Sequence, residues 1–133
     1  MAMSSLIVGQ EPLRFLRLRQ TIGALLIVSI IYLSLTPHPV ALPGEHGDKY
    51  GHALAYATLM FWYALIYVRW RERIGLAVAF VCMGIGLEFL QRLTDYRTFD
   101  VADMAADAFG VSVGWLAAMP RWRHFLRCHG SRL

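Results

Sequence analysis

Residues 51–90 read GHALAYATLMFWYALIYVRWRERIGLAVAFVCMGIGLEFL. Two apolar runs, 51–68 and 74–90, flank a short link that contains Arg69, Arg71 and Arg73. A helix that crosses a membrane needs about 20 mostly apolar residues, with a range of roughly 17–25. Inside lipid, the backbone polar groups of such a run are satisfied by a helix. The stretch therefore predicts a helical hairpin embedded in a membrane.

Two further apolar runs lie outside this hairpin, at 21–35 and 101–119, and the first extends back to Arg19. The 133-residue chain is 57% hydrophobic and 17% charged. An ordinary soluble domain has about 25% charged residues, so the composition argues against both a soluble domain and a disordered chain. We predict an all-α, polytopic membrane protein, a bundle of four transmembrane helices at about 19–36, 50–68, 73–91 and 100–119.

The arginines predict the orientation of this bundle. Only Lys49, Arg92 and Arg97 fall on one side of the four predicted spans. The other side holds Arg14, Arg17, Arg19, Arg69, Arg71, Arg73, Arg121, Arg123, Arg127 and Arg132. Lys and Arg accumulate in short cytoplasmic loops. We therefore predict a multi-pass protein of the bacterial inner membrane whose N- and C-termini are cytoplasmic. Residues 1–18 form the N-terminal segment, 19–119 the membrane domain and 120–133 a basic tail. Because each basic group borders an apolar run, we expect the lipid bilayer, not nucleic acid, as partner.

The acidic residues are distributed in the opposite way. Those on the predicted outer side or within the spans are Glu45, Asp48, Glu88, Asp95, Asp100, Asp103 and Asp107. A charged side chain near the middle of a bilayer costs about 2.5–3.5 kcal/mol on insertion scales. Glu88, Asp103 and Asp107 must therefore face protein, water or a ligand.

Helical spacing places these acids on facing stripes. Asp100, Asp103 and Asp107 follow an i, i+3, i+7 pattern, which lies on one face of a helix. A second stripe is Gly84, Glu88 and Gln91, and a third is Asp48 or Lys49 with His52, Tyr56 and Tyr63. We expect the three stripes to converge on a polar pocket in the outer half of the membrane. The first span has no charged residue between 21 and 35 and is expected at the periphery.

Glycines also follow helical spacing. Gly110 and Gly114 form a small-xxx-small pattern, which permits two helices to approach closely. Gly84 and Gly86 are expected to serve packing in the same way.

Two blocks of this sequence resemble the VanZ-like family of bacterial membrane proteins. The first block is D-K-x-x-H-x-x-x-Y at 48–56. The second runs from E-x-x-Q at 88–91 through R-x-x-D-x-x-D at 97–103 to Asp107, Gly110 and Gly114. The family commonly has asparagine where this chain has Asp107. The resemblance implies a link to low-level resistance to the glycopeptide teicoplanin, without fixing a biochemical activity.

The residues leave several functions open. One hypothesis is an envelope protein that acts on or binds an anionic, lipid-linked precursor, with Lys49, His52 and Arg97 as the cationic groups. Its candidate catalytic residues are His52, Glu88 and Asp103. Its candidate binding residues are Asp48, Lys49, Tyr56, Gln91, Arg97, Asp100 and Asp107. A divalent cation is conceivable on these oxygen and imidazole ligands, although their spacing matches no named metal motif.

Two alternatives come from other classes. The polar residues can form a salt-bridge network in a non-catalytic protein that binds a partner. They can also relay protons in a transporter, which with four spans would need to be a dimer. In every case Arg97 and Lys49 are expected to offset the acids only in part. We therefore expect either a protonated carboxyl group, most simply Asp107, or a bound cation.

Overall fold

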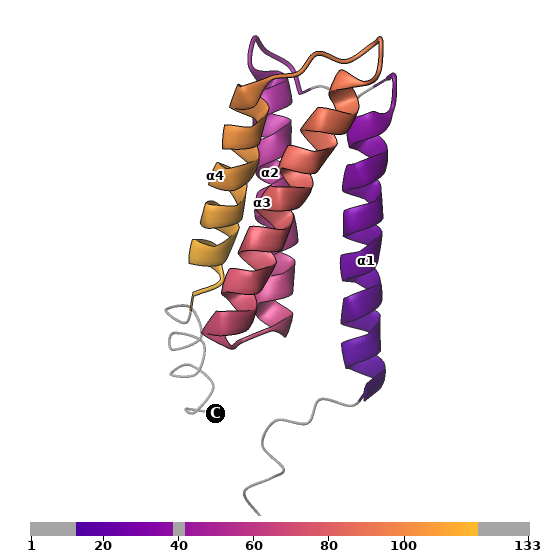
Figure 1. Cartoon of the computed structure of the whole chain (residues 1–133). Helices are drawn as coiled ribbons and strands as arrows, with labels where there is room; N and C mark the ends of the chain where they lie inside the picture. Colours follow the sequence, from indigo (N-terminus) through magenta and orange to yellow (C-terminus); the bar gives the residue numbers. More distant parts are fainter. Residues whose placement is uncertain (1–12, 39–41, 120–133) are drawn as a thin grey trace, which may run out of the picture.

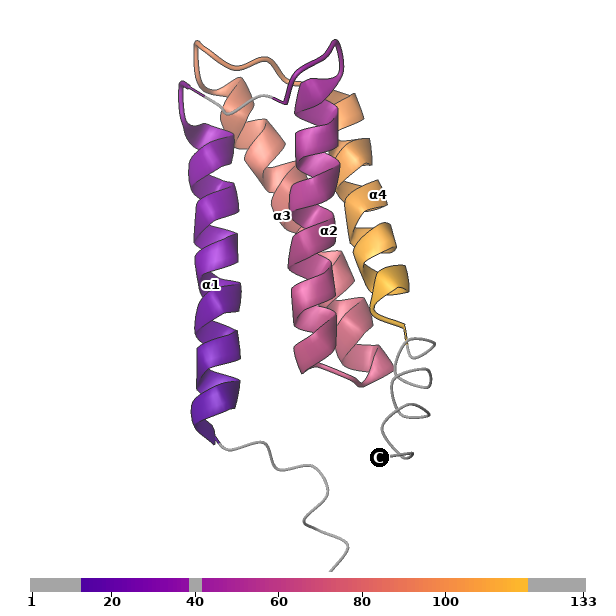
Figure 2. The same ribbon diagram turned by 180° about the vertical axis from the view of Figure 1, so that it is seen from behind.

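The computed structural model describes residues 13–38 and 42–119, which form helices joined by short loops and contain no strand. Its four helices are α1 (Leu13–Leu35), α2 (Gly47–Ile66), α3 (Trp70–Arg92) and α4 (Val101–Ala117). Figure 1 shows that the helices run alternately up and down, and Figure 2 shows that α1 lies to one side of the other three. The predicted all-α class is confirmed for the described residues.

Two of these helices, α1 and α3, are long and apolar enough to cross a membrane. The helix α2 begins with the charged residues Asp48 and Lys49, and α4 has only 17 residues. By length and composition, two helices can therefore cross a membrane, while the four spans and the orientation of the termini stay predictions. The basic tail, 120–133, lies outside the described residues, as do residues 1–12.

Three helices begin earlier than the apolar runs predicted. The helix α1 begins at Leu13 rather than at about residue 19. The helices α2 and α3 begin at Gly47 and Trp70 rather than at about 50 and 73. Arginine and leucine are good helix formers, and the long arginine stem lies along apolar surface while its head reaches water. Hydropathy therefore marks where a span is buried in lipid, not where its helix starts.

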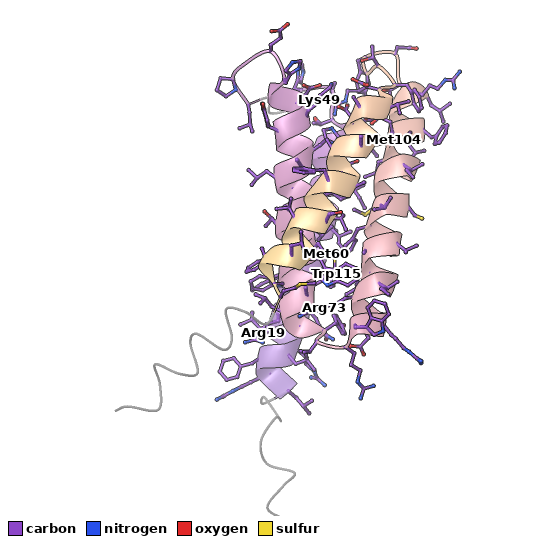
Figure 3. The ribbon with its side chains drawn as sticks, turned by 90° about the vertical axis from the view of Figure 1, so that its left-hand side faces the viewer. Arg19, Lys49, Met60, Arg73, Met104 and Trp115 are labelled. Atoms are coloured by element: carbon purple, nitrogen blue, oxygen red, sulfur yellow. The ribbon has the colours of Figure 1, made fainter. Side chains whose placement is uncertain are left out.

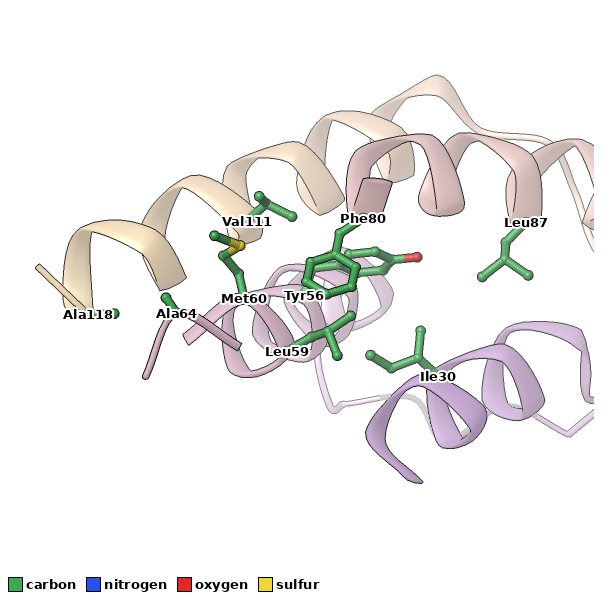
Figure 4. Close-up of a cluster of buried hydrophobic side chains, with 9 residues drawn as sticks. All are labelled: Ile30, Tyr56, Leu59, Met60, Ala64, Phe80, Leu87, Val111 and Ala118. Carbon is green, nitrogen blue, oxygen red and sulfur yellow. The ribbon is translucent and has the colours of Figure 1, made fainter. Parts of the chain in front are cut away.

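The apolar core is centred on α2. Tyr56, Leu59 and Met60 are almost fully buried there. Phe80 and Leu87 of α3, Val111 of α4 and Ile30 of α1 also point into the core (Figure 4). This core lies below the polar residues described in the next subsection and fixes the three helices that carry them.

Glycines set the distance between α2 and α4. A Cβ atom on Gly110 would overlap the carbonyl group of Ala53, and one on Gly114 would overlap the carbonyl oxygen of Ala57. The packing role predicted for both glycines is confirmed. The same prediction was wrong for Gly86, because nothing lies within 4 Å of a Cβ placed there. Residues two positions apart are rotated by about 200° around the helix axis, so Gly86 faces away from the side of α3 on which Gly84 lies.

A buried arginine binds the backbone carbonyls at the end of α2, beside the α2–α3 link. Arg73 is only 6% exposed. Its Nη2 donates to the carbonyl oxygen of Ala64 at 2.6 Å, and its Nε donates to that of Tyr67 at 3.0 Å. These carbonyls end α2 and have no partner within the helix. Arg73, which the sequence placed in a surface link, therefore caps α2.

Candidate functional site

The polar residues of three helices meet at the opposite end of the bundle, where Figure 3 shows Lys49 far from Arg19 and Arg73. We call this group the polar cluster. It comprises Lys49 and His52 of α2, Glu88 of α3, and Asp100, Asp103 and Asp107 of α4 and its N-cap. The α2 start, the α3 end and the α4 start lie side by side there, because the three helices alternate in direction.

Lys49 joins α2 to α4. Its Nζ lies 2.8 Å from Oδ2 of Asp100 and 3.4 Å from Oδ1 of Asp103. Asp48 is a third, looser partner at 3.5 Å. The hydrogen bond with Asp100 raises the pKa of Lys49, and the same bond lowers the pKa of Asp100. Lys49 is therefore a fixed positive charge that holds the α4 N-terminus against α2.

His52 lies between two carboxylates, one turn deeper. Its Nδ1 is 2.8 Å from Oδ1 of Asp107, and its Nε2 is 3.8 Å from Oδ2 of Asp103. Asp107 is 2% exposed and Asp103 is 8% exposed. The close contact with Asp107 orients the imidazole, and the longer distance leaves Nε2 without a tight hydrogen bond to Asp103.

Glu88 joins α3 to the start of α4. This side chain is 1% exposed, and its Oε1 accepts the backbone N–H of Asp100 at 2.6 Å. Asp100 in turn caps α4, since its Oδ1 accepts the N–H of Ala102 at 2.8 Å. Acidic groups at a helix N-terminus are favourable because of the helix dipole. One oxygen of Glu88 therefore already has a structural partner.

Gly84 makes space for the deepest acid of the polar cluster. A Cβ atom at this position would lie 2.6 Å from Oδ2 of Asp107. Gly84 therefore accommodates a carboxylate, a role that its predicted part in helix packing did not include. Its position one turn before Glu88 on the same stripe was the available signal.

Two residues predicted for this site turn elsewhere. Nε2 of Gln91 donates to the carbonyl oxygen of Ser34 at 2.6 Å, and Nη2 of Arg97 donates to the same oxygen at 3.1 Å. Tyr96, which the sequence analysis did not single out, donates to the carbonyl oxygen of Leu35 at 2.9 Å. We call Gln91, Tyr96 and Arg97 the α1 cap, because they bind the unpaired carbonyls that end α1.

The α1 cap corrects two expectations. Arg97 was expected to offset the acids, but its guanidinium group donates to a backbone carbonyl. The ammonium group that pairs with Asp100 and Asp103 is that of Lys49. Gln91 was expected on the stripe of Glu88, yet it points toward α1 because α1 ends beside it. An arginine at a helix C-terminus is favourable for the same dipole that favours acids at the N-terminus.

Two further candidates lie at the margins of the polar cluster. The Asp48 side chain is 55% exposed, at the loop end of α2. Tyr56 is 2% exposed and belongs to the apolar core, with its hydroxyl pointing toward the end of the bundle where Leu87 lies (Figure 4). Neither forms a contact with His52 among the hydrogen bonds of the described residues.

The polar cluster contains more acids than bases. Four carboxyl groups face Lys49 and His52, so the ionised acids would exceed the bases even with His52 protonated. Within residues 13–38 and 42–119, no group of three or more His, Cys, Asp or Glu side chains is arranged to hold a metal ion. The divalent cation therefore stays a sequence-based hypothesis without a ligand set.

The helices and the polar cluster define an all-helical membrane protein with acidic and imidazole side chains buried between its helices. A family model described as VanZ/LLP1 matches residues 13–125. The chain therefore belongs to the VanZ/LLP1 family, as its sequence motifs had indicated.

One similar protein comes from a yeast. An uncharacterized protein of Schizosaccharomyces pombe, C11E3.10, is 34% identical over 105 residues. The match covers 74% of this chain and 63% of the yeast protein. No solved structure matches the chain significantly.

Proposed function

We propose that this protein binds and acts on the anionic head group of a lipid-linked envelope molecule at the polar cluster. The observation that carries the proposal is the setting of His52, whose Nδ1 lies 2.8 Å from Asp107. A carboxylate that holds one imidazole nitrogen fixes the ring and its tautomer, so that the other nitrogen can transfer a proton. Ionisable groups buried between membrane helices mark functional sites by default.

Lys49 is the group proposed to contact the ligand. It lies at the loop end of α2, and its side chain is 31% exposed. A phosphate oxygen can replace Asp100 as its partner, since both are anionic acceptors of the same ammonium group. Because the carboxyl groups of the polar cluster outnumber Lys49 and His52, they would repel a doubly charged phosphate. The site therefore favours a phosphate group that carries a proton or a bound cation.

The proposed setting is a multi-pass protein whose polar cluster faces the outer side of the bacterial inner membrane. The distribution of arginines supports this orientation. The yeast relative favours a ligand chemistry that is not confined to bacterial cell walls. A lipid phosphate fits that requirement, and a change in teicoplanin resistance would follow from altered handling of such a lipid.

A second candidate is a non-catalytic protein in which the polar cluster only joins helices and positions a partner-binding surface. One observation favours it. Among the described residues, every buried side-chain nitrogen or oxygen has a hydrogen-bond partner. A satisfied network of this kind is compatible with structural stabilisation alone.

Ligand binding separates the two candidates. The full-length protein in detergent would be mixed with farnesyl phosphate or with farnesol, and bound lipid measured by native mass spectrometry. We expect the phosphate to bind about tenfold more tightly, as one charge-assisted hydrogen bond predicts. The Lys49→Gln variant, which lacks the ammonium group proposed to contact the ligand, should lose this preference at normal abundance. The matched control is Arg92→Gln, which removes an exposed cation at the same end.

Two results would count against the proposed function. Equal binding of farnesyl phosphate and farnesol by the wild-type protein would show that the protein does not recognise the anionic head group. A fall in the abundance of Lys49→Gln, without any change in binding per molecule, would favour the structural candidate.

The link to glycopeptides has its own test. A Gram-positive host would express the wild-type protein, His52→Gln or His46→Gln at matched levels, and survival on teicoplanin would be counted. Survival should rise with the wild-type protein and with His46→Gln but not with His52→Gln. Identical survival in all three strains would show that His52 of the polar cluster does not contribute to teicoplanin resistance.

A further inference from the structure

A second charged region lies at the other end of the bundle, and its sign is opposite. Arg14 and Arg17 are exposed in the first turns of α1, and Arg69 and Arg71 are exposed at the α2–α3 link. None of these four arginines forms an ion pair with a described residue. We call Arg14, Arg17, Arg69 and Arg71 the arginine end.

Two contacts bring these arginines together from distant parts of the sequence. Nε1 of Trp62 donates to the backbone carbonyl oxygen of Arg19 at 2.9 Å. Nε2 of Gln20 lies 3.4 Å from the hydroxyl oxygen of Tyr67. Both contacts join the start of α1 to the end of α2. They therefore place two separate pairs of arginines at the same end of the molecule.

Exposed apolar side chains border the arginine end. Leu13 is 72% exposed, Phe15 is 47% exposed and Trp70 is 67% exposed. Leu18 and Val68 are also exposed. Both helices that begin at this end, α1 and α3, are apolar enough to cross a membrane. Aromatic and basic residues at the ends of such helices are typical of the interface between lipid tails and head groups.

The acids near this region are fewer than its arginines. Among the described residues, Glu72 lies in the first turn of α3 beside Arg71. The remaining segments of the sequence contain one acid, Glu11, and four further arginines, Arg121, Arg123, Arg127 and Arg132. A second copy in the same membrane orientation would present the same arginines at the same level. The excess of arginines therefore favours an anionic partner from outside the chain.

We infer that the arginine end is a binding site for anionic phospholipid head groups, which bridge the start of α1 to the α2–α3 link. A guanidinium group binds a phosphate through paired hydrogen bonds, and the flanking apolar side chains contact the acyl chains. The bridge strengthens the attachment of α1, which lies to one side of the other helices (Figure 2). The site is independent of the polar cluster and of the function proposed for it.

The test compares two lipids that differ in head-group charge. The full-length protein in detergent would receive dioleoyl phosphatidylglycerol or dioleoyl phosphatidylcholine, and binding would be followed by native mass spectrometry and by thermal melting. We expect phosphatidylglycerol to bind about tenfold more tightly, in line with the attraction of anionic lipids for a few basic residues. The preference should shrink as NaCl is raised.

Two double variants test the bridge. Arg14→Gln with Arg17→Gln, and Arg69→Gln with Arg71→Gln, should each lower the preference for phosphatidylglycerol about threefold or more. The matched control is Arg92→Gln, which removes an exposed arginine at the opposite end and should change nothing. A variant with lysine at the same four positions retains the positive charge and should keep most of the preference for phosphatidylglycerol.

Several outcomes would overturn the inference. Equal binding of the two lipids by the wild-type protein would do so without any variant. A preference unchanged in both double variants would move the lipid site elsewhere. Tight binding of a short DNA or RNA oligonucleotide, with no lipid preference, would identify the partner as nucleic acid.

Discussion

The polar cluster and the α1 cap lie at the same end of the bundle, and both bury polar side chains between helices. In the α1 cap, Gln91 and Arg97 donate to a backbone carbonyl, so a donor meets an acceptor without surplus charge. In the polar cluster, side chains bind mostly other side chains, and the acids outnumber the bases. Adjacent buried polar residues can therefore have different roles. Those of the α1 cap bind the carbonyls that end a helix, whereas those of the polar cluster leave more ionisable acids than bases.

Replacing Asp107 by leucine should give the largest loss of stability. The substitution keeps the volume but leaves His52 without its 2.8 Å partner. Removing one member of a buried pair costs about 3–5 kcal/mol. Thermal melting in detergent and the yield of folded protein would measure the effect. A loss below about 1 kcal/mol would show that His52 does not depend on this carboxylate.

Replacing Gln91 by leucine should have the next largest effect, and a local one. The variant removes a buried donor to the Ser34 carbonyl, although Arg97 still reaches the same oxygen. The expected cost is about 1–3 kcal/mol. Hydrogen exchange should accelerate in peptides of α1 more than in those of α2 or α4. Equal acceleration in all helices would contradict the distinction between the α1 cap and the polar cluster.

Replacing Asp107 by asparagine should be tolerated, with a change within about 1 kcal/mol. An amide oxygen can still accept from His52, and the excess of acids falls by one carboxyl group. The resemblance described above also implies that asparagine is common at the position of Asp107. The same melting assay as for leucine applies. If asparagine proves as harmful as leucine, the negative charge itself is required, and a bound cation becomes the better explanation.

Replacing Lys49 by glutamine should have the smallest effect near neutral pH, because Asp48 and Asp100 are partly exposed and the buried partner, Asp103, lies at the longer distance of 3.4 Å. Its consequence is a changed response to acid. Lys49 lowers the pKa of Asp100. The stabilisation from this carboxylate is therefore present above the unfolded pKa of Asp, about 4, and is lost as the pH falls through the lower folded value.

Melting temperatures between pH 6 and pH 3 would measure that response. The wild-type protein should lose stability below about pH 4, and Lys49→Gln should lose less over the same interval. Parallel curves for the two proteins would show that Asp100 does not depend on Lys49. Arg92→Gln serves as the control, because it removes an exposed charge outside the polar cluster.

The sequence predicted the helices well and the site in part. Runs of apolar residues at helical spacing located all four helices, because such runs can bury their backbone groups only as helices. The stripes of His52, Glu88, Asp103 and Asp107 predicted that these side chains would meet, and they lie together. The functional roles assigned to them stay predictions. Arg97 was misassigned because it lies in the α3–α4 connection, where helical spacing gives no direction to a side chain.

The sequence by itself determined the helical class, the family and the segregation of arginines from acids. These depend on composition and on spacing along single helices, which the chain carries locally. Only the tertiary structure decided how Gly84 makes space for Asp107 and how the end of α1 comes to lie beside Gln91 and Arg97. Such contacts depend on the distance and rotation between helices, and these are set by the packing of all the side chains together.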